Sequence, residues 1–290
     1  MPLRDTLLTL LVVFIWGTSF VAIRFGVDEM PPILFTALRF AFSALPAVFF
    51  LPRPKIALWI ILAYGTTLGV IKFSLLFIAI KLGMPIGLTS IVVQMQVFFT
   101  ILLAFFVYGE APTRLQIIGA LIAFAGIVIF GYARAQAAPL LPFVMVLGAA
   151  FFWGVSNVIG KKAGKVDMLA FVVWASLVAP LPLLGLSWLV EGPEAIAAAA
   201  SALSLKGIGS IAFVSYVATI IGFGLWGRLL SKHPVSAVTP FALLIPVVGM
   251  ACGVIFFGEV LTIPILIGSG VVFAGLLINV FGDRLVRSRR

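Results

Sequence analysis

Two basic side chains interrupt long apolar stretches of the chain, where charges are rare. Arg39 lies in the apolar run 32–51, and Lys72 lies in the run 57–80. If both runs cross a membrane, a rise of 1.5 Å per residue places each charge about 10 to 12 Å from the same surface. A charge at that depth is costly and usually faces a cavity or the bundle interior. The pair therefore predicts a site for a carboxylate or phosphate group, unless both side chains extend outward along their apolar stems or Arg39 caps helix carbonyls.

Aromatic and polar side chains form a second candidate group. Trp16 and Ser19 share one helical face, and Trp153 shares a face with Ser156 and Asn157, because residues three or four apart are neighbours on a helix. An aromatic wall with hydroxyl and amide groups suits a zwitterionic or aromatic ligand. The alternative is hydrogen bonding between packed helices. Further polar groups expected along the same path are Gln94, Gln96, Trp174 and Tyr216.

Two prolines interrupt a third apolar run, 235–257. Pro240 and Pro246 each remove a helical hydrogen bond and so free the carbonyls of Ser236 and Ala242. We expect hinge points here, or carbonyls that bind a ligand amine. A kink without any ligand role is the alternative.

Carboxylates are distributed differently from the two cations. Each Asp and Glu lies at or near a predicted loop, whereas proton relays and cation sites usually have one at mid-membrane depth. The sequence therefore disfavours proton coupling and a cationic substrate. Glu110 and Glu259 end two apolar runs in the similar contexts YGE and FGE, where gating, capping and helix termination are the possible roles.

Little in the sequence suits catalysis or metal binding. Cys252 is the single cysteine and His233 the single histidine, which excludes a disulfide framework and a cysteine-based metal site. The closest approach to a phosphate-binding loop, at 154–161, has five residues between its glycines instead of four. We expect His233 to be a solvated loop residue, and we predict no enzyme activity, catalytic residue, metal or cofactor.

The composition defines the elements that must position these residues. The chain has 290 residues, of which 63% are apolar and 10% charged, and its mean hydropathy is +1.29. A soluble enzyme, a secreted disulfide scaffold and a disordered chain are excluded, because the polar surface is too small. Since a spanning helix needs about 20 residues, we predict an all-α integral membrane protein with ten transmembrane helices, at 6–24, 32–51, 57–80, 86–107, 113–132, 140–160, 168–190, 207–229, 235–257 and 262–281.

The charge pattern predicts the orientation of these helices. With the N-terminus in the cytoplasm, the cytoplasmic loops and termini collect 13 Lys and Arg residues and the outer loops collect four, Arg24, Lys81, Arg134 and Lys206. Basic residues favour cytoplasmic loops, so both termini are predicted to be cytoplasmic. The net charge of +10 is therefore a topology signal with some attraction to lipid headgroups, and no nucleic-acid partner is expected.

The sequence also repeats itself. IGALIAFAG at 118–126 aligns with IGSGVVFAG at 267–275 at an offset of 149, and FIWGTS at 14–19 aligns with FFWGVS at 151–156 at an offset of 137. The difference fits an insertion in the Ala-rich stretch 191–206, where we expect a short interfacial helix on the outer face. Five spans per repeat, in 1–137 and 138–290, would make the two halves inverted, as in many secondary transporters.

These residues carry a family resemblance. WGTSFVAIRFG at 16–26, ALRF at 37–40 and the paired YGE/FGE and IGxxxxFAG segments resemble the drug/metabolite transporter superfamily, EamA type. The chain looks most similar to the amino-acid and metabolite exporters of that family, including the YddG type. The resemblance implies ten spans and an alternating-access carrier that does not hydrolyse ATP.

The resulting hypothesis is a secondary transporter in a bacterial inner (plasma) membrane. It would move small amino acids or related metabolites, in the direction of export and by facilitated diffusion. Lys72 and Arg39 would bind the carboxylate, and the Trp and Asn groups the remainder of the substrate. The alternatives are a carrier of phosphorylated or nucleotide-type metabolites and a proton-coupled drug or metabolite exporter. The oligomeric state is open, and a monomer would suffice.

Overall fold

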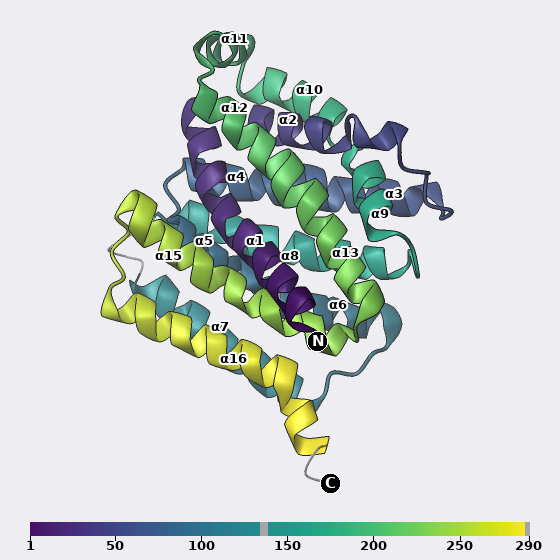
Figure 1. Ribbon diagram of the computed structural model, residues 1–290. Helices are drawn as coiled ribbons and strands as arrows, with labels where there is room; N and C mark the ends of the chain where they lie inside the picture. Colours follow the sequence, from purple (N-terminus) through teal and green to yellow (C-terminus); the bar gives the residue numbers. More distant parts are fainter. Residues whose placement is uncertain (134–138, 288–290) are drawn as a thin grey trace.

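The computed structural model describes residues 1–133 and 139–287, and these residues form helices joined by short connections (Figure 1). Most helices lie side by side and are inclined in one common direction. The elements are α1 (Leu3–Glu29), α2 (Pro32–Ala44), η1 (Ala47–Phe49), α3 (Leu58–Tyr64), η2 (Gly65–Lys72), α4 (Phe73–Lys81), α5 (Ile86–Val92), η3 (Val93–Met95), α6 (Gln96–Tyr108), α7 (Arg114–Ala133), α8 (Leu140–Lys161), α9 (Met168–Ser176), α10 (Pro180–Val190), α11 (Pro193–Ala202), α12 (Leu205–Ala212), η5 (Phe213–Ile221), α13 (Gly222–Lys232), α14 (Val235–Val238), η6 (Thr239–Leu244), α15 (Ile245–Phe257) and α16 (Ile263–Arg287).

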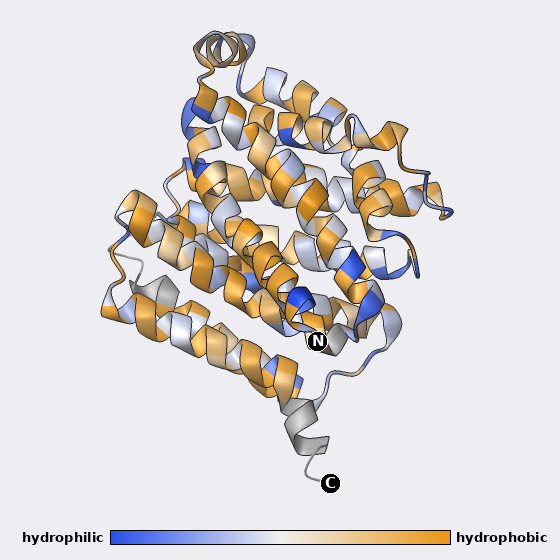
Figure 2. Ribbon diagram, viewed as in Figure 1, coloured by the Kyte–Doolittle hydropathy of each residue, from blue (hydrophilic) through white to orange (hydrophobic). Residues whose placement is uncertain are grey.

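Consecutive elements combine into membrane-spanning segments. Among the described residues, nine such segments are long and apolar enough to cross a membrane. The remaining predicted run, 113–132, corresponds to α7, of which the shorter stretch Arg114–Ile129 is apolar. Figure 2 shows apolar residues over most of the helical surface and hydrophilic ones gathered toward the helix ends and loops. The chain is therefore an all-helical integral membrane protein, while the count of ten spans and the orientation of the termini stay predictions.

Several predicted boundaries differ from the structure, among them the end of the last helix, which continues to Arg287 rather than residue 281, and two of the differences have identifiable reasons. The first helix continues to Glu29 rather than residue 24, because Arg24 pairs with Asp28 one turn later at 3.1 Å and keeps the polar end helical. The second helix ends at Ala44 rather than residue 51. Pro46 follows, and its ring cannot continue a helical hydrogen-bond pattern.

Besides η1, four of the described segments depart from α-helical geometry, and these four form two related pairs. η2 and η5 are π-helices, and residues 65–72 of η2 correspond to 214–221 of η5 at the offset of 149. η3 and η6 are 3-10 helices, and 93–95 corresponds to 242–244 at the same offset. π-Helical turns are rare and often occur at functional sites. The repeat in the sequence is thus matched by a repeat in where the helices depart from α geometry.

The glycine motifs bring α7 and α16 together in a layer at the edge of the bundle (Figure 1). A Cβ atom on Gly119 would lie 2.6 Å from the carbonyl oxygen of Gly275, and one on Gly126 would lie 2.8 Å from that of Gly268. Only glycine allows backbones to approach so closely. The offset of 149 relates Gly119 to Gly268 and Gly126 to Gly275, so the contacts are reciprocal.

The insertion in the second half contains the expected short helix. α11 spans Pro193–Ala202 and follows Gly192, whose φ of 86° favours glycine. Figure 1 shows α11 outside the bundle, above the ends of α10 and α12. The side chain of Ser204 then caps α12 by accepting hydrogen bonds from two backbone amides. The helix is therefore confirmed, and its interfacial placement stays a prediction.

The largest apolar core lies between α1, α2, α4, α5 and α8. Val27, Phe35, Phe77 and Val146 are fully buried in it. The rings of Phe73 and Trp153 pack against this core. Core packing therefore fixes two aromatic rings that meet the buried cations.

Candidate functional site

Arg39 and Lys72, the two cations predicted from the sequence, meet at one aromatic ring. The guanidinium carbon of Arg39 lies 3.6 Å from the centroid of the Phe73 ring. The Nζ atom of Lys72 lies 3.3 Å from the same centroid. The two charges are therefore no farther apart than these two distances combined. Cation–π contacts of this kind stabilise a buried cation but do not neutralise it.

The surroundings of Arg39 leave much of its guanidinium group without a partner. The side chain is 6% exposed, and its Nη2 atom lies 3.5 Å from Thr219 Oγ1. Nε and Nη1 have no hydrogen-bond partner among the described residues. The backbone carbonyl of Arg39 accepts hydrogen bonds from Ser43 at 2.8 Å and from Ser215 at 3.0 Å. The position of Arg39 is thus fixed, while two of its donors point at no protein acceptor in the described part of the chain.

Lys72 is even more buried, at 3% exposure, and it ends η2. Its Nζ atom lies 4.3 Å from the centroid of the Trp153 ring, so the ammonium group is held between two aromatic rings. The ion pairs among the described residues join other groups: Arg24 with Asp28, Lys161 with Glu110, and His233 with Asp5. Burial of an unpaired ion costs several kcal/mol. An anion between Lys72 and Arg39 would remove that cost.

The two π-helical segments place the groups around this pair. η2 ends at Lys72, and η5 carries Ser215 and Thr219. Thr219 Oγ1 donates to the carbonyl of Val214, five residues earlier, at 2.8 Å. The site therefore combines side chains from two distorted helices with Arg39 from α2 and Trp153 from α8.

The glycines of η2 let α9 and the turn that follows it approach closely. A Cβ atom on Gly65 would lie 2.5 Å from the carbonyl oxygen of Ala175, and one on Gly69 would lie 2.9 Å from the Cβ atom of Ala179. The small-xxx-small spacing of these two glycines therefore forms a tight helix contact. Lys72 shares that segment, and its side chain lies inside the protein rather than toward lipid.

Asn157 and its neighbour Ser156 form hydrogen bonds between helices. The Nδ2 atom of Asn157 donates to Gln96 at 2.7 Å and to Thr100 at 3.0 Å, which joins α8 to α6. Ser156 donates to Thr67 of η2 at 3.0 Å. These contacts match the packing alternative, because both hydrogen bonds of the Asn157 amide join it to side chains of α6.

Trp16 and Ser19 lie between α1 and the segment formed by η5 and α13. The indole Nε1 of Trp16 donates to the carbonyl of Ala218 at 2.9 Å, and its ring packs against Phe223 and Trp226 with centroids 5.2 Å apart. Ser19 donates to the carbonyl of Trp16 at 2.6 Å. Ala218 precedes Thr219, so Trp16 supports the helix that contacts Arg39.

The remaining candidates are distributed along the segments. Gln94 is 6% exposed within η3, and Tyr216 is 38% exposed on η5. Pro240 lies in η6, where the helix is a 3-10 helix, and the carbonyl of Pro246 accepts a hydrogen bond from Ser90 at 3.3 Å. Among the described residues, Trp153 is the sequence candidate that directly contacts one of the two cations.

Sequence reasoning missed several groups of the site and misplaced His233. Phe73, Ser215 and Thr219 contact the cations or fix their backbone, but isolated Phe, Ser and Thr residues in an apolar run give no signal. The expectation that His233 is solvated was wrong. Its side chain is 16% exposed, and its Nε2 atom lies 2.6 Å from Asp5 Oδ2. Among the described residues there is no group of three or more potential metal ligands.

The helices and their buried polar site define a polytopic membrane protein, and the comparison of its sequence with protein families gives the class. The EamA-like transporter family matches residues 4–132 and again residues 140–281. The chain belongs to this family and is a membrane transporter, a multi-pass protein of the inner membrane. The first matched region supplies Arg39 and Lys72, and the second supplies Trp153 and Thr219.

Similar proteins are known over the full length of the chain. The chain is 41% identical to the "Probable amino-acid metabolite efflux pump" of Salmonella typhimurium, over 100% of this chain and 99% of that protein. It is 37% identical to the protein of the same name from Escherichia coli, over 98% and 97% of the two chains. A "Probable terminal-alkyne amino-acid exporter" from Streptantibioticus cattleyicolor is 26% identical over 92% and 90%. A crystal structure of a protein with 19% identity covers 95% of both chains with a TM-score of 0.64, which supports the fold alone.

Proposed function

We propose that the protein exports small amino acids or closely related metabolites across the inner membrane. Two similar proteins carry the name amino-acid metabolite efflux pump. The observation that carries the proposal is the pair Arg39 and Lys72, buried over one aromatic ring with no described carboxylate beside either charge. An amino-acid carboxylate supplies the missing negative charge.

The site suits a carboxylate in geometry as well as in charge. The free donors of Arg39 and the ammonium group of Lys72 both lie at the Phe73 ring, so one carboxylate can bridge them with charge-assisted hydrogen bonds. The Trp153 ring borders the ammonium group and provides an apolar wall for the rest of the substrate. We assign the carboxylate to Arg39 and Lys72, and the substrate side chain to the region of Trp153.

The proposed mechanism is alternating access by two five-helix halves, 1–137 and 138–290, in inverted orientation with both termini in the cytoplasm. The site takes residues from both halves, as expected for transporters with inverted repeats. Two observations support it: the reciprocal glycine contacts of α7 and α16, and the repeat-related distortions in η2 and η5. The distorted helices would absorb the change in shape. Transport would be facilitative, because the hydrogen-bonded carboxylates of the described residues lie at or near helix ends.

A carrier of phosphorylated metabolites is the second candidate. Two adjacent cations match the two negative charges of a phosphate monoester as well as one cation matches a carboxylate. The two candidate substrates differ in how much of their binding remains after substitution of either Arg39 or Lys72 alone. A carboxylate retains partial binding when one cation is lost, whereas a doubly charged phosphate is left with an unneutralised charge.

Counterflow in proteoliposomes tests the proposal. Vesicles holding the purified protein are preloaded with unlabelled amino acids, and the entry of each labelled amino acid is followed without a proton gradient. We expect saturable uptake, reduced at least about tenfold in Lys72→Ala and Arg39→Ala, because each removes one of the two charge-assisted partners that would bridge the carboxylate. Lys55→Ala, which removes an exposed loop cation, is the matched control and should transport normally.

Each other outcome identifies an alternative. Uptake that appears only with an imposed proton gradient would overturn the facilitative mechanism. Exchange of phosphorylated metabolites without exchange of amino acids would replace the substrate class. Equal activity of Lys72→Ala, Arg39→Ala and Lys55→Ala would place the substrate elsewhere.

A further inference from the structure

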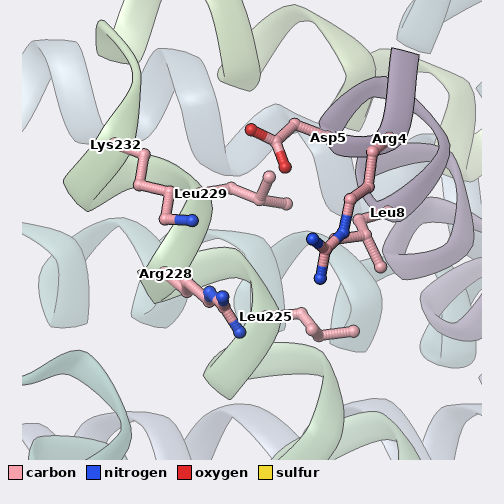
Figure 3. Close-up of a pocket in the computed structure, with 7 residues that line it drawn as sticks. All are labelled: Arg4, Asp5, Leu8, Leu225, Arg228, Leu229 and Lys232. Atoms are coloured by element: carbon pink, nitrogen blue, oxygen red, sulfur yellow. The ribbon is translucent and has the colours of Figure 1, made fainter. Parts of the chain in front are cut away.

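A hollow lies where the beginning of α1 meets the end of α13, outside the group of residues that forms the proposed substrate site. Figure 3 shows its lining: three cations, a carboxylate and three leucines, with side chains from the two helices. The residues are Arg4, Asp5 and Leu8 of α1, and Leu225, Arg228, Leu229 and Lys232 of α13. None of them belongs to the site around Phe73.

The hollow carries an excess of positive charge. Arg4, Arg228 and Lys232 are exposed, and none of them is in an ion pair among the described residues. Asp5 is the carboxylate of the lining, and its Oδ2 atom is engaged with His233 at 2.6 Å. Three cations therefore face a space in which the nearest negative charge already has a partner. Such a surface attracts an anion with several acceptor oxygens.

The apolar part of the lining identifies the kind of anion. Leu8, Leu225 and Leu229 line the hollow. Beyond them, α1 presents large apolar side chains to its surroundings, with Leu7 57% exposed and Leu11 45% exposed. Leu11 follows Leu7 by four residues and Leu8 by three, so this apolar ridge continues directly from the leucines that line the hollow. A soluble anion would make no favourable contact with such an apolar ridge, whereas the acyl chains of a lipid would pack against it.

We propose that the three exposed cations around this small hollow bind, at the protein surface, the phosphodiester headgroup of an anionic membrane phospholipid. Arg4, Arg228 and Lys232 contact the phosphate, and the acyl chains follow the leucines of α1 into the bilayer. Basic pockets between membrane-spanning helices are suited to anionic headgroups. The lipid would bridge α1, which lies in the first matched region of the chain, and α13, which lies in the second. Occupancy therefore holds the two halves together at this end.

Native mass spectrometry of the purified full-length protein tests this site. The protein is titrated with phosphatidylglycerol and, separately, with phosphatidylcholine of the same acyl chains. We expect one phosphatidylglycerol retained with an affinity at least about tenfold above that of phosphatidylcholine. The triple variant Arg4→Gln/Arg228→Gln/Lys232→Gln should lose this preference.

Two further variants separate the site from a general attraction to charge. Arg53→Gln/Lys55→Gln/Lys165→Gln removes three exposed cations from other loops and should retain the lipid. Arg4→Lys/Arg228→Lys keeps the charges and should also retain it, which controls for misfolding of the first variant. Equal loss in both triple variants would overturn the proposal in favour of diffuse surface attraction. Inorganic phosphate that displaces the phospholipid at comparable concentration would show a site for soluble anions instead.

Discussion

The two ends of the bundle are joined by contacts of different chemistry. At the end that carries residues 82–85 and 258–262, here called the opposite end, carboxylates bind the starts of helices. Glu259 accepts hydrogen bonds from two backbone amides in the first turn of α5, at 2.5 and 2.9 Å. Glu191 does the same for α2, at 2.7 and 3.0 Å. Glu29 accepts a hydrogen bond from the hydroxyl of Ser204, which caps α12.

At the end that carries the N-terminus and residues 109–113, here called the basic end, carboxylates meet the side chains of Lys and His instead. Glu110 pairs with Lys161, and both side chains are about half exposed, at 52% and 51%. Asp5 pairs with His233 at 2.6 Å. As at the opposite end, each contact joins a residue of the first matched region to one of the second.

The difference indicates which end separates more easily. A hydrogen bond to a charged group contributes about 1.5 to 3 kcal/mol, and a carboxylate at a helix N-terminus also interacts with the helix dipole. At the basic end, the exposed ion pair of Glu110 and Lys161 contributes about 0 to 1 kcal/mol. The contact between Asp5 and His233, which is mostly buried, is then one strong contact against the two carboxylates that each accept two backbone hydrogen bonds at the opposite end. We therefore expect the opposite end to be the firmly closed one in this structure, and the basic end to open at lower cost.

Removal of the Glu259 carboxylate should have the largest effect on this comparison. The carboxylate fits against Gly87 and Gly253, where a Cβ atom would lie 2.9 and 2.3 Å from it. Glu259→Ala leaves two buried amides of α5 without acceptors and weakens the closed end by about 2 to 3 kcal/mol. Cys252 is adjacent to Gly253 and only 6% exposed. Its rate of alkylation by a small thiol reagent should rise by more than about tenfold.

Two variants control this experiment. Glu194→Ala removes an exposed carboxylate from α11 and should leave Cys252 labelling unchanged. Glu259→Gln keeps an acceptor oxygen for the amides and should remain close to the parent protein. If all three variants label alike, Glu259 does not hold this end closed.

The Glu191 contact should have a smaller effect, on stability more than on opening. Glu191 also accepts a hydrogen bond from Ser187 of its own helix at 2.6 Å, so part of its network survives any separation of α10 from α2. Glu191→Ala should lower the free energy of unfolding by about 1 to 2 kcal/mol. Thermal unfolding in detergent measures this change, and Ser187→Ala separates the local contact from the cap. If Glu191→Ala increased the labelling of Cys252 more than Glu259→Ala does, Glu191 rather than Glu259 would be the stronger contact at this end.

These contacts also show how far sequence reasoning reaches. The spans followed from apolar runs, because bilayer thickness fixes the length of a helix. Glu259 was recognised as a capping or gating candidate, but its partner in α5 is 173 residues away. Which of several helix starts a carboxylate reaches depends on how the spans are arranged, and spacing along the chain does not contain that information.

The candidate site was predictable to a similar degree. A Lys and an Arg can be recognised as candidates within apolar runs, because burying a charge there is unfavourable whatever the arrangement of the helices. That both meet the Phe73 ring depends on the rotation of two helices and on the π-helical geometry of η2. Asn157 illustrates the opposite case, since an amide on the same face as Trp153 binds a neighbouring helix instead.

Acidification should strengthen the opposite end. Burial raises the pKa of the Glu259 carboxyl above its ordinary value of 4.5, against the opposing effect of the amides of Gly87 and Ile86. When this end opens, water reaches the carboxyl and its pKa returns toward the ordinary value. The closed state of this end therefore binds the proton of Glu259 more tightly than the open state does. The resulting stabilisation is complete below pH 4.5 and is lost as the pH rises through the raised pKa.

The measurement is the ratio of Cys252 labelling in the parent protein to that in Glu259→Gln, from about pH 5 to about pH 8. Taking the ratio removes the pH dependence of the thiol itself. We expect the ratio to rise with pH, because deprotonation favours the open end only where Glu259 is present. A ratio that does not change with pH would show that Glu259 has the same pKa in the closed and open states of this end, which would contradict the prediction.

The smallest effect is expected for the pair of Glu110 and Lys161 at the basic end. Both side chains are about half exposed, so water and salt screen the charges, and ordering two side chains offsets part of the attraction. A double-mutant cycle of Glu110→Gln, Lys161→Gln and their combination should give a coupling energy of at most about 1 kcal/mol in thermal unfolding. High salt should reduce that coupling further. A coupling as large as the effect of Glu259→Ala would mean that the two ends are held equally firmly, and the asymmetry between them would then have to come from helix packing rather than from these carboxylates.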